Sequence, residues 1–211
     1  CLNVPVDKAA CDTAHQQLSP VSSLGHLYVG VRHENRWSKQ SGLPGQPEET
    51  PPWRLVGVTD GTRLTWEPSR PAGAPETLER GQLAEFVGSG PFVVHSQDEL
   101  HPFYFAQYMT GASELGEAET TGDPEWINVV PVDQWLSRYV LFADPTFPVT
   151  NLVVVRRRGG APINLDCLGS LEGWSSLGAY EFTRVPLTQG NYENVGTCST
   201  GRHEMKSVEP F

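Results

Sequence analysis

The sequence predicts an all-β protein made of two related antiparallel β-sandwich-like repeats, of which the second is incomplete. Strand-like segments recur about every ten residues with turn signals between them, as they do in sandwiches. No segment keeps a helical apolar period for long, and the 21 glycines and 18 prolines favour turns over helices. Several short motifs also recur in the same order. A propeller-like arrangement of repeats is the alternative.

One motif occurs twice: a proline, a large apolar residue and a Tyr-Val pair, each separated from the next by three residues. Its copies are Pro20, Leu24, Tyr28 and Val29, and Pro131, Trp135, Tyr139 and Val140. Further matches in the same order join Leu55–Val58 to Leu152–Val155, Leu64 to Ile163, and Ser89-Gly90-Pro91-Phe92 to Ser207–Phe211. Repeated units bury the same pattern positions. We therefore expect Tyr28 to be equivalent to Tyr139, and Leu55 to Leu152.

Residues 1–110 form the first predicted repeat. Its strand-like segments are residues 27–31, 53–58, 62–66, 83–87, 92–96 and 103–109. The sequence Thr59-Asp60-Gly61 predicts a tight hairpin between the second and third segments, because Asp-Gly suits the left-handed turn positions. Residues 38–52 and 68–75, which are rich in proline, are predicted to be loops.

Residues 111–122 are small and acidic and are the predicted linker, and residues 123–211 form the second repeat. Its strand-like segments are residues 127–130, 139–142, 152–156, 163–165, 180–185 and 203–206. This repeat is expected to lack closing strands, because it has no counterpart of residues 103–109. An open sheet edge is an aggregation hazard. We therefore expect another chain or a donated strand to complete the second repeat, in preference to a self-sufficient monomer.

The charge balance excludes some classes of partner. The chain has 15 basic and 25 acidic residues and a formal net charge of -10, whereas nucleic-acid binders need basic stripes that displace counterions. The basic run Arg156-Arg157-Arg158 comes at the end of an apolar strand and is expected to be a solvated strand end. No apolar stretch approaches the ~18–20 residues needed to span a bilayer.

The four cysteines fall into two local pairs, Cys1 with Cys11 and Cys167 with Cys198. Neither pair has the spacing of a zinc knuckle. An even number of cysteines in a chain rich in glycine, proline and strands favours disulfides and an oxidising compartment. Two disulfides with this local pairing are therefore predicted, and four buried free thiols are the alternative.

The cluster of residues 95–101 is the most catalytic-looking part of the sequence. On a continuing strand, His95, Glu99 and His101 lie on one face and form weak candidates for metal ligands. Their spacing matches no zinc motif, so an ordinary loop is the favoured interpretation. Acidic loops around Asp123 and Asp144 offer oxygen ligands of the kind that calcium prefers, but no cofactor is predicted.

Other catalytic patterns are weaker still. His33-Glu34 and His203-Glu204 each pair an imidazole with a carboxylate, but adjacent residues on a strand point to opposite faces. The sequence has no serine elbow, phosphate loop or dinucleotide fingerprint. Trp66 and Trp135 lie in strand patterns, where core packing is expected rather than a sugar-stacking platform. No catalytic residue is predicted.

Several segments resemble the N-terminal domain family of IgGFc-binding proteins. They are residues 16–29, Glu125-Trp126-Ile127-Asn128-Val129-Val130-Pro131, and Gly173-Trp174 through Tyr180-Glu181-Phe182-Thr183-Arg184-Val185. The run from Cys198 through Gly201-Arg202-His203-Glu204-Met205 to Pro210-Phe211 resembles the bacterial members. The resemblance implies a secreted or surface protein that binds or adheres and has no catalytic residues. It does not carry antibody binding over to a bacterial homologue.

These observations together predict a non-catalytic extracellular or cell-surface module with a binding, adhesion or structural role. Its expected partner is a protein or glycan ligand, or another chain that completes the second repeat, and neither nucleic acid nor a membrane span is expected. One alternative is a secreted hydrolase with a site near His95, Glu99 and His101. Another is the repeating subunit of a surface filament completed by a partner strand.

Overall fold

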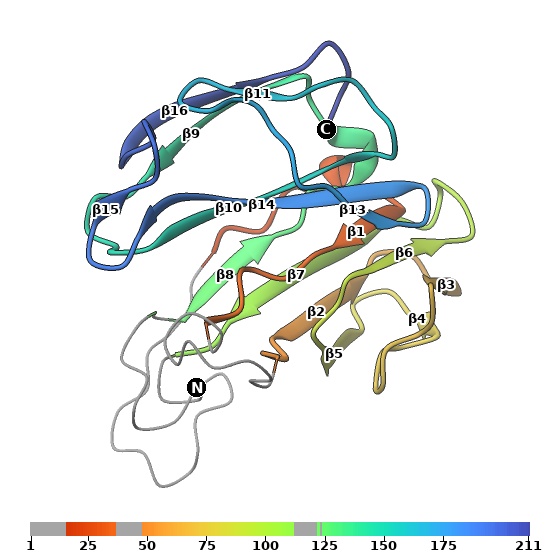
Figure 1. Cartoon of the computed structure of the whole chain (residues 1–211). Coiled ribbons are helices and arrows are strands. Elements are labelled where there is room, and N and C mark those ends of the chain that lie inside the picture. The colour runs from red at the N-terminus through yellow and green to blue at the C-terminus, as the bar shows by residue number, and fades with distance from the viewer. Residues whose placement is uncertain (1–15, 37–47, 112–121, 123) are drawn as a thin grey trace, which may run out of the picture. The chain divides into compact units, whose positions relative to one another are not determined.

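The computed structural model describes residues 16–36, 48–111, 122 and 124–211 (Figure 1). The chain divides into two compact units, Cys1–Asp133 and Gln134–Phe211. The described residues form antiparallel sheets and short 3-10 helices, including η1 (Val21–Ser23) and η3 (Val132–Gln134). The predicted all-β fold class is therefore confirmed.

The described residues of the first unit form two four-stranded sheets. One has the order β1 (Leu27–Gly30), β6 (Phe92–Ser96), β3 (Thr62–Glu67) and β4 (Thr77–Leu78). The other has the order β5 (Leu83–Val87), β2 (Pro52–Gly57), β7 (Phe103–Met109) and β8 (Glu125–Asn128). Both sheets contribute to one apolar core, which is the arrangement of a sandwich rather than of a single-sheet propeller blade.

Alternation along the strands explains how this core forms. On β3, Thr62, Leu64 and Trp66 are buried while the residues between them are exposed. Strand β7 lies inside its sheet, and nearly all its positions are buried. Its Phe103 and Phe105 belong to the main core, whereas Tyr104, Ala106 and Tyr108 form a cluster on the opposite face. Strand β7 therefore has apolar residues on both of its faces, as is typical of a strand that is covered on both sides.

The segment Thr59-Asp60-Gly61 does not form the predicted hairpin. Strand β2 pairs with β5 and β7, and β3 pairs with β4 and β6, so the two strands do not pair with each other. Gly61 does have the left-handed conformation that the Asp-Gly signal predicts, with φ of 67°. The turn was predicted correctly, but it carries the chain from one sheet to the other.

The second unit also contains two sheets. One has the order β12 (Gly169–Ser170), β11 (Asn164–Leu165), β16 (Gly201–Lys206) and β9 (Arg138–Ala143). The other has the order β10 (Thr150–Arg157), β14 (Tyr180–Gln189) and β13 (Ser175–Leu177), with β15 (Glu193–Asn194) also paired to β14. A disulfide joins Cys167 to Cys198, as predicted. Cys1 and Cys11 lie outside the described residues.

The sheets that carry the two Tyr-Val pairs have matching strand orders. The order β1-β6-β3-β4 in the first unit corresponds to β9-β16-β11-β12 in the second. Tyr28 pairs with Val94 just as Tyr139 pairs with Met205. Each tyrosine hydroxyl also accepts a hydrogen bond from the N–H of the third residue before it, at 3.0 Å from Gly25 and 2.9 Å from Leu136. This is the correspondence expected of repeats.

The backbone hydrogen bonds between segments give Phe211 a different counterpart in the first unit from the one that the sequence motif predicts. The N–H of Phe211 donates to the carbonyl of Leu136 at 3.1 Å, as the N–H of Phe103 donates to that of Gly25 at 3.0 Å. Phe211 therefore corresponds to Phe103, and its match to Phe92 was wrong. The dipeptide Pro-Phe occurs at both places in the first unit, so the motif alone was ambiguous.

The division between the units also comes later than the predicted linker. Strand β8, which the sequence places in the repeat of residues 123–211, pairs with β7 of the first unit, for example Tyr108 with Trp126. The compact units divide between Asp133 and Gln134. The predicted linker at 111–122 therefore precedes this division in the sequence.

Candidate functional sites

The three predicted metal-ligand candidates do not form one ligand set. His95 lies on β6 with Nδ1 3.0 Å from the carbonyl oxygen of Ser96. His101 lies in the following loop with Nδ1 2.6 Å from Oδ1 of Asp98, and Glu99 is exposed. Among the described residues, the one group of three ligand-type side chains that lie close together is elsewhere. Each histidine instead makes a local contact.

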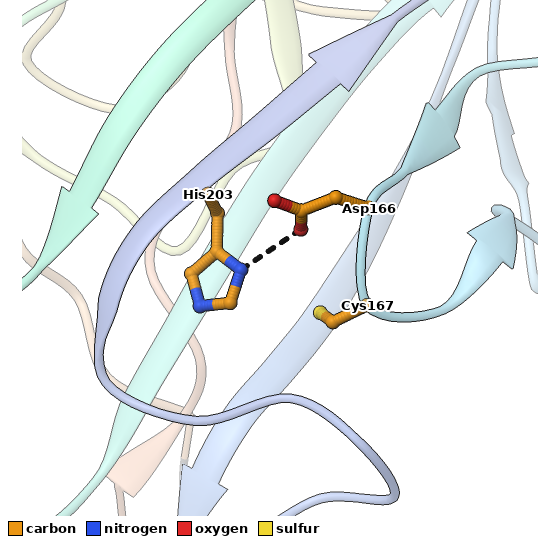
Figure 2. Close-up of side chains that lie close together, drawn as sticks. All are labelled: Asp166, Cys167 and His203. Carbon is orange, nitrogen blue, oxygen red and sulfur yellow. Dashed lines mark hydrogen bonds and ion pairs between the residues drawn. The ribbon is translucent and has the colours of Figure 1, made fainter.

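That group is Asp166, Cys167 and His203 (Figure 2). His203 is buried, and its two ring nitrogens lie 2.9 Å from Asp166 Oδ1 and 2.8 Å from the carbonyl oxygen of Ser199. Cys167 is bonded to Cys198, so its sulfur is not available as a thiolate. The group is therefore better explained as a polar contact beside the disulfide than as a metal centre.

His203 has acceptors at both ring nitrogens, which favours the doubly protonated imidazolium. Burial alone lowers the pKa of His203, but the hydrogen bonds to Asp166 and Ser199 outweigh it and raise the pKa above its ordinary value. The sequence drew attention to His203-Glu204, but the carboxylate partner is Asp166. The two residues lie far apart in sequence, and only the pairing of β16 with β11 brings them together.

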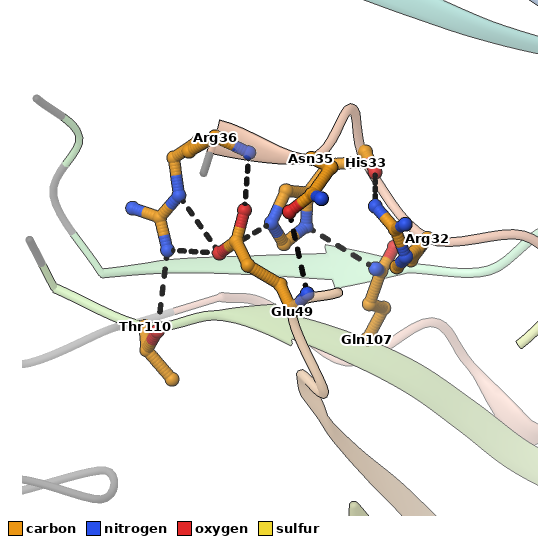
Figure 3. Close-up of polar contacts among 7 residues, drawn as sticks. All are labelled: Arg32, His33, Asn35, Arg36, Glu49, Gln107 and Thr110. Carbon is orange, nitrogen blue, oxygen red and sulfur yellow. Dashed lines mark hydrogen bonds and ion pairs between the residues drawn. The ribbon is translucent and has the colours of Figure 1, made fainter. Parts of the chain in front are cut away.

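A second polar cluster surrounds Glu49 in the first unit (Figure 3). Arg36 donates to Glu49 from its backbone N–H at 2.6 Å and from its guanidinium at 2.9 Å and 2.6 Å. His33 Nε2 lies 3.3 Å from the same carboxylate, and its Nδ1 lies 3.3 Å from Gln107 Nε2 on β7. Because the Gln107 amide nitrogen is a donor, His33 Nδ1 accepts from it, and His33 Nε2 faces the carboxylate as the donor.

The Glu49 carboxylate is held as an anion. Burial by itself raises its pKa, but the hydrogen bonds from His33 and Arg36 outweigh burial and lower the pKa to about 2. Its side chain is only 4% exposed, so little of it faces solvent for a substrate to reach. The cluster connects the segment after β1 to the segment before β2 and to β7, which is a structural role.

A third site is an exposed face in the second unit, here called the β9–β16 face. It consists of Arg138, Val140 and Phe142 on β9 and Arg202, Glu204 and Lys206 on β16. On β9, Leu141 and Ala143 pack in the core of this unit, so Val140 and Phe142 point to the other face. They are 58% and 69% exposed. Val29, which follows Tyr28 as Val140 follows Tyr139, is only 5% exposed.

The charged groups of the β9–β16 face form one network. Glu204 contacts Lys206 at 2.7 Å, Arg138 at 2.9 Å and Arg202 at 3.2 Å. The hydrogen bonds from Lys206 and Arg138, followed by that from Arg202, lower the pKa of Glu204 to about 2. Three cations around one carboxylate leave this face positive within a chain whose formal net charge is -10. The face therefore combines exposed apolar side chains with positive charge.

The chain is an all-β protein with two compact units, a disulfide and an exposed sheet face that is apolar and basic. The family model described as IgGFc binding protein matches residues 1–211. The chain therefore belongs to the IgGFc-binding protein family, whose domains are extracellular binding domains. Searches of curated proteins and of solved structures found no match. Among the described residues, no helix is long and apolar enough to cross a membrane.

Proposed function

We propose that the chain is a non-catalytic extracellular module that binds a protein ligand through the β9–β16 face. The observation that carries this proposal is the exposure of Val140 and Phe142, side by side with three cationic side chains, in a member of a binding family. Large exposed apolar groups rimmed by polar ones mark interaction sites, and aromatic and arginine side chains supply much of the binding energy at protein interfaces.

The charge of the face indicates the chemistry of the ligand. Arg138, Arg202 and Lys206 outnumber Glu204, so an acidic protein surface is the complementary partner. An apolar group on that ligand would cover Phe142. The Fc part of IgG is the first protein to test, because the description of the family names it.

The finer features of this role are part of the proposal. The matching strand orders and tyrosine contacts support two related repeats. Attachment to a cell surface or adhesion is the proposed biological setting of a member of this binding family. The alternative of a hydrolase would need His95, Glu99 and His101 in one site, but their side chains are engaged separately or exposed.

Photo-crosslinking from the face tests the proposal. A benzophenone amino acid replaces Phe142 in one variant and Leu100, which is 80% exposed in the first unit, in a control variant. Each variant is irradiated in a concentrated mixture of extracellular proteins supplemented with purified Fc. We expect protein adducts from position 142, competed by excess unlabelled chain, and few from position 100. Equal yields from the two positions, or competition by a Phe142→Ser chain as strong as by the unmodified one, would overturn the proposal.

A further inference from the structure

A second feature, separate from the β9–β16 face, is the set of metal-ligand atoms beside the Cys167–Cys198 disulfide. The ligand atoms of Asp166, Cys167 and His203 all lie within 4.8 Å of one another (Figure 2). Ligand atoms around a tetrahedral zinc ion lie roughly 3–4 Å apart, because each is about 2.0–2.3 Å from the metal. The three side chains therefore need only small displacements to share one ion. While the disulfide is intact, however, Cys167 has no thiolate to offer.

The fold already orients the imidazole and the carboxylate as metal sites do. His203 Nε2 lies 2.8 Å from the carbonyl oxygen of Ser199, so its N–H donates there and Nδ1 is directed at Asp166. Histidines that bind metals usually donate their second ring N–H to such an acceptor, which fixes the orientation of the ring. Asp166 is held by Glu204, whose backbone N–H donates to Oδ2 at 2.9 Å and whose carbonyl accepts from the Asp166 N–H at 3.0 Å. Oδ1 remains on the side of His203.

Cys198 supplies a fourth ligand once the disulfide is open. Its Cα lies 4.9 Å from that of Cys167. Contacts that do not involve sulfur hold both backbones: the N–H of Cys198 donates to the carbonyl of Val195 at 3.0 Å, and the Thr197 hydroxyl donates to the carbonyl of Cys167. The two sulfurs therefore remain near each other after reduction. Two thiolates, an imidazole and a carboxylate are all zinc ligands, and four protein ligands make the closed tetrahedral set of a structural site.

We infer that the reduced chain binds zinc through Cys167, Cys198, His203 and Asp166, so that the disulfide and the metal are alternative cross-links at one place. Two equivalents of a small thiol supply two electrons and two protons, which convert the S–S bond into two cysteine thiols, and the reductant is oxidised to its own disulfide. Zinc then forms two bonds to sulfur, one to Nδ1 of His203 and one to Oδ1 of Asp166. It displaces one proton from each thiol and one from the imidazolium. The ion reconnects the turn after β11 to the segment before β16.

The test uses the full chain with Cys1→Ala and Cys11→Ala, which keeps no cysteines besides Cys167 and Cys198. Its oxidised form is compared with a reduced form that has been freed of reductant without air. Titration with Zn²⁺ against a chromophoric chelator gives the affinity, and Co²⁺ reports thiolate ligands through its sulfur-to-cobalt charge-transfer absorption. We expect the reduced form to bind Zn²⁺ at least about a hundredfold more tightly than the oxidised form. Equal affinities, or bound Co²⁺ without that absorption, would overturn the inference.

Variants of the same chain identify the ligands. His203→Gln and Asp166→Asn should each weaken Zn²⁺ binding to the reduced form by at least about tenfold. His101→Gln removes a histidine that also contacts an aspartate but lies outside this group, so it should leave the affinity unchanged. Cys198→Ser leaves Cys167 as a thiol without any reductant and should still give the Co²⁺ absorption. Equal losses from His203→Gln and His101→Gln would contradict the proposed ligand set.

Unfolding of the second unit provides an independent measurement. Zn²⁺ should raise the unfolding midpoint of the reduced chain and leave that of the oxidised chain unchanged, because a ligand stabilises only the form that binds it. If the reduced chain unfolds, Zn²⁺ should fold it again, since metal binding is coupled to folding. A reduced chain that Zn²⁺ neither stabilises nor folds would overturn the inference. Phe142→Ser should not change the response to Zn²⁺, so this result and that for the β9–β16 face are independent.

Discussion

The ring of Phe211 packs edge-on against the ring of Tyr139, with centroids 5.0 Å apart and an interplanar angle of 68°. Phe103 and Tyr28 form the corresponding pair in the first unit, at 4.9 Å. The surroundings of the two tyrosines differ in one respect. The Tyr28 hydroxyl also donates to the carbonyl of Phe103 at 2.5 Å, whereas no described residue accepts a hydrogen bond from that of Tyr139. The same motif thus has a more complete environment in the first unit.

The tyrosine pair allows a matched comparison of stability. Tyr28→Phe removes a buried hydroxyl that both accepts and donates, so we expect a loss of about 1–3 kcal/mol in the free energy of unfolding. Tyr139→Phe removes one hydrogen bond at a partly buried site and should cost about 0.5–1.5 kcal/mol. Urea unfolding of the two variants measures the difference. A larger cost for Tyr139→Phe would contradict the hydrogen-bond assignment.

Much of the fold was predictable because strand alternation is a local signal. The buried and exposed positions of β3 follow from Leu64, Thr65 and Trp66. Trp66 and Leu165, each two residues after the matched pair Leu64 and Ile163, lie opposite Val94 and Met205. Pairing partners are not local. The sequence therefore predicted a hairpin between β2 and β3, which lie in different sheets, and missed short strands such as β12 and β15.

The candidate sites were less predictable than the fold. On β9, Tyr139, Leu141 and Ala143 are as apolar as Val140 and Phe142, so the pattern does not reveal which face is covered. The Glu49 cluster joins residues from three separate segments, none with a recognisable motif. The sequence does contain one signal for the β9–β16 face. Arg, Val and Phe alternate along β9, and Arg, Glu and Lys alternate along β16, but the two patterns form one face only once β9 is known to pair with β16.

The disulfide should make a measurable contribution to the second unit. Cys167 and Cys198 are 31 residues apart, and a cross-link of this kind stabilises by about 2–4 kcal/mol, chiefly through the unfolded chain. We expect the double variant Cys167→Ala/Cys198→Ala to lose about that amount in urea unfolding. Reduction of a Cys1→Ala/Cys11→Ala chain, which keeps only the Cys167–Cys198 bond, should reproduce the loss. An unchanged unfolding midpoint in both cases would show that the bond does not stabilise this unit.

Glu49 predicts a specific dependence of stability on pH. The pKa of Glu49 falls from 4.5 in the unfolded chain to about 2 in the folded protein. The ionised carboxylate therefore stabilises the folded state fully above the unfolded-state pKa, and this stabilisation is lost as the pH falls through the folded-state pKa. Glu49→Gln should therefore cost about 2 kcal/mol near neutral pH, and this cost should shrink between the two pKa values. Glu48→Gln, at an exposed neighbouring site, is the control. A cost independent of pH would contradict the charged state.

Glu204 is the acidic residue at the centre of the β9–β16 face, and its removal should change binding through charge. Glu204→Gln leaves Arg138, Arg202 and Lys206 without their shared carboxylate, so the face becomes more positive. We expect tighter binding of the crosslinked ligand and a steeper decrease in affinity with salt, because the proposed partner surface is acidic. Affinity measured over a range of salt concentrations tests this. Weaker binding with a flatter salt dependence would indicate that the ligand is not acidic.

The affinity of the crosslinked ligand for matched exposed-residue variants tests the central claim most directly. Phe142→Ser removes the aromatic ring of the face, whereas Val87→Ser removes a 51% exposed apolar side chain from β5 in the first unit. Aromatic anchors at interfaces contribute about 2 kcal/mol or more. We therefore expect the dissociation constant to rise at least about tenfold for Phe142→Ser and to stay within about twofold for Val87→Ser. Equal dissociation constants for the two variants would contradict binding through the β9–β16 face.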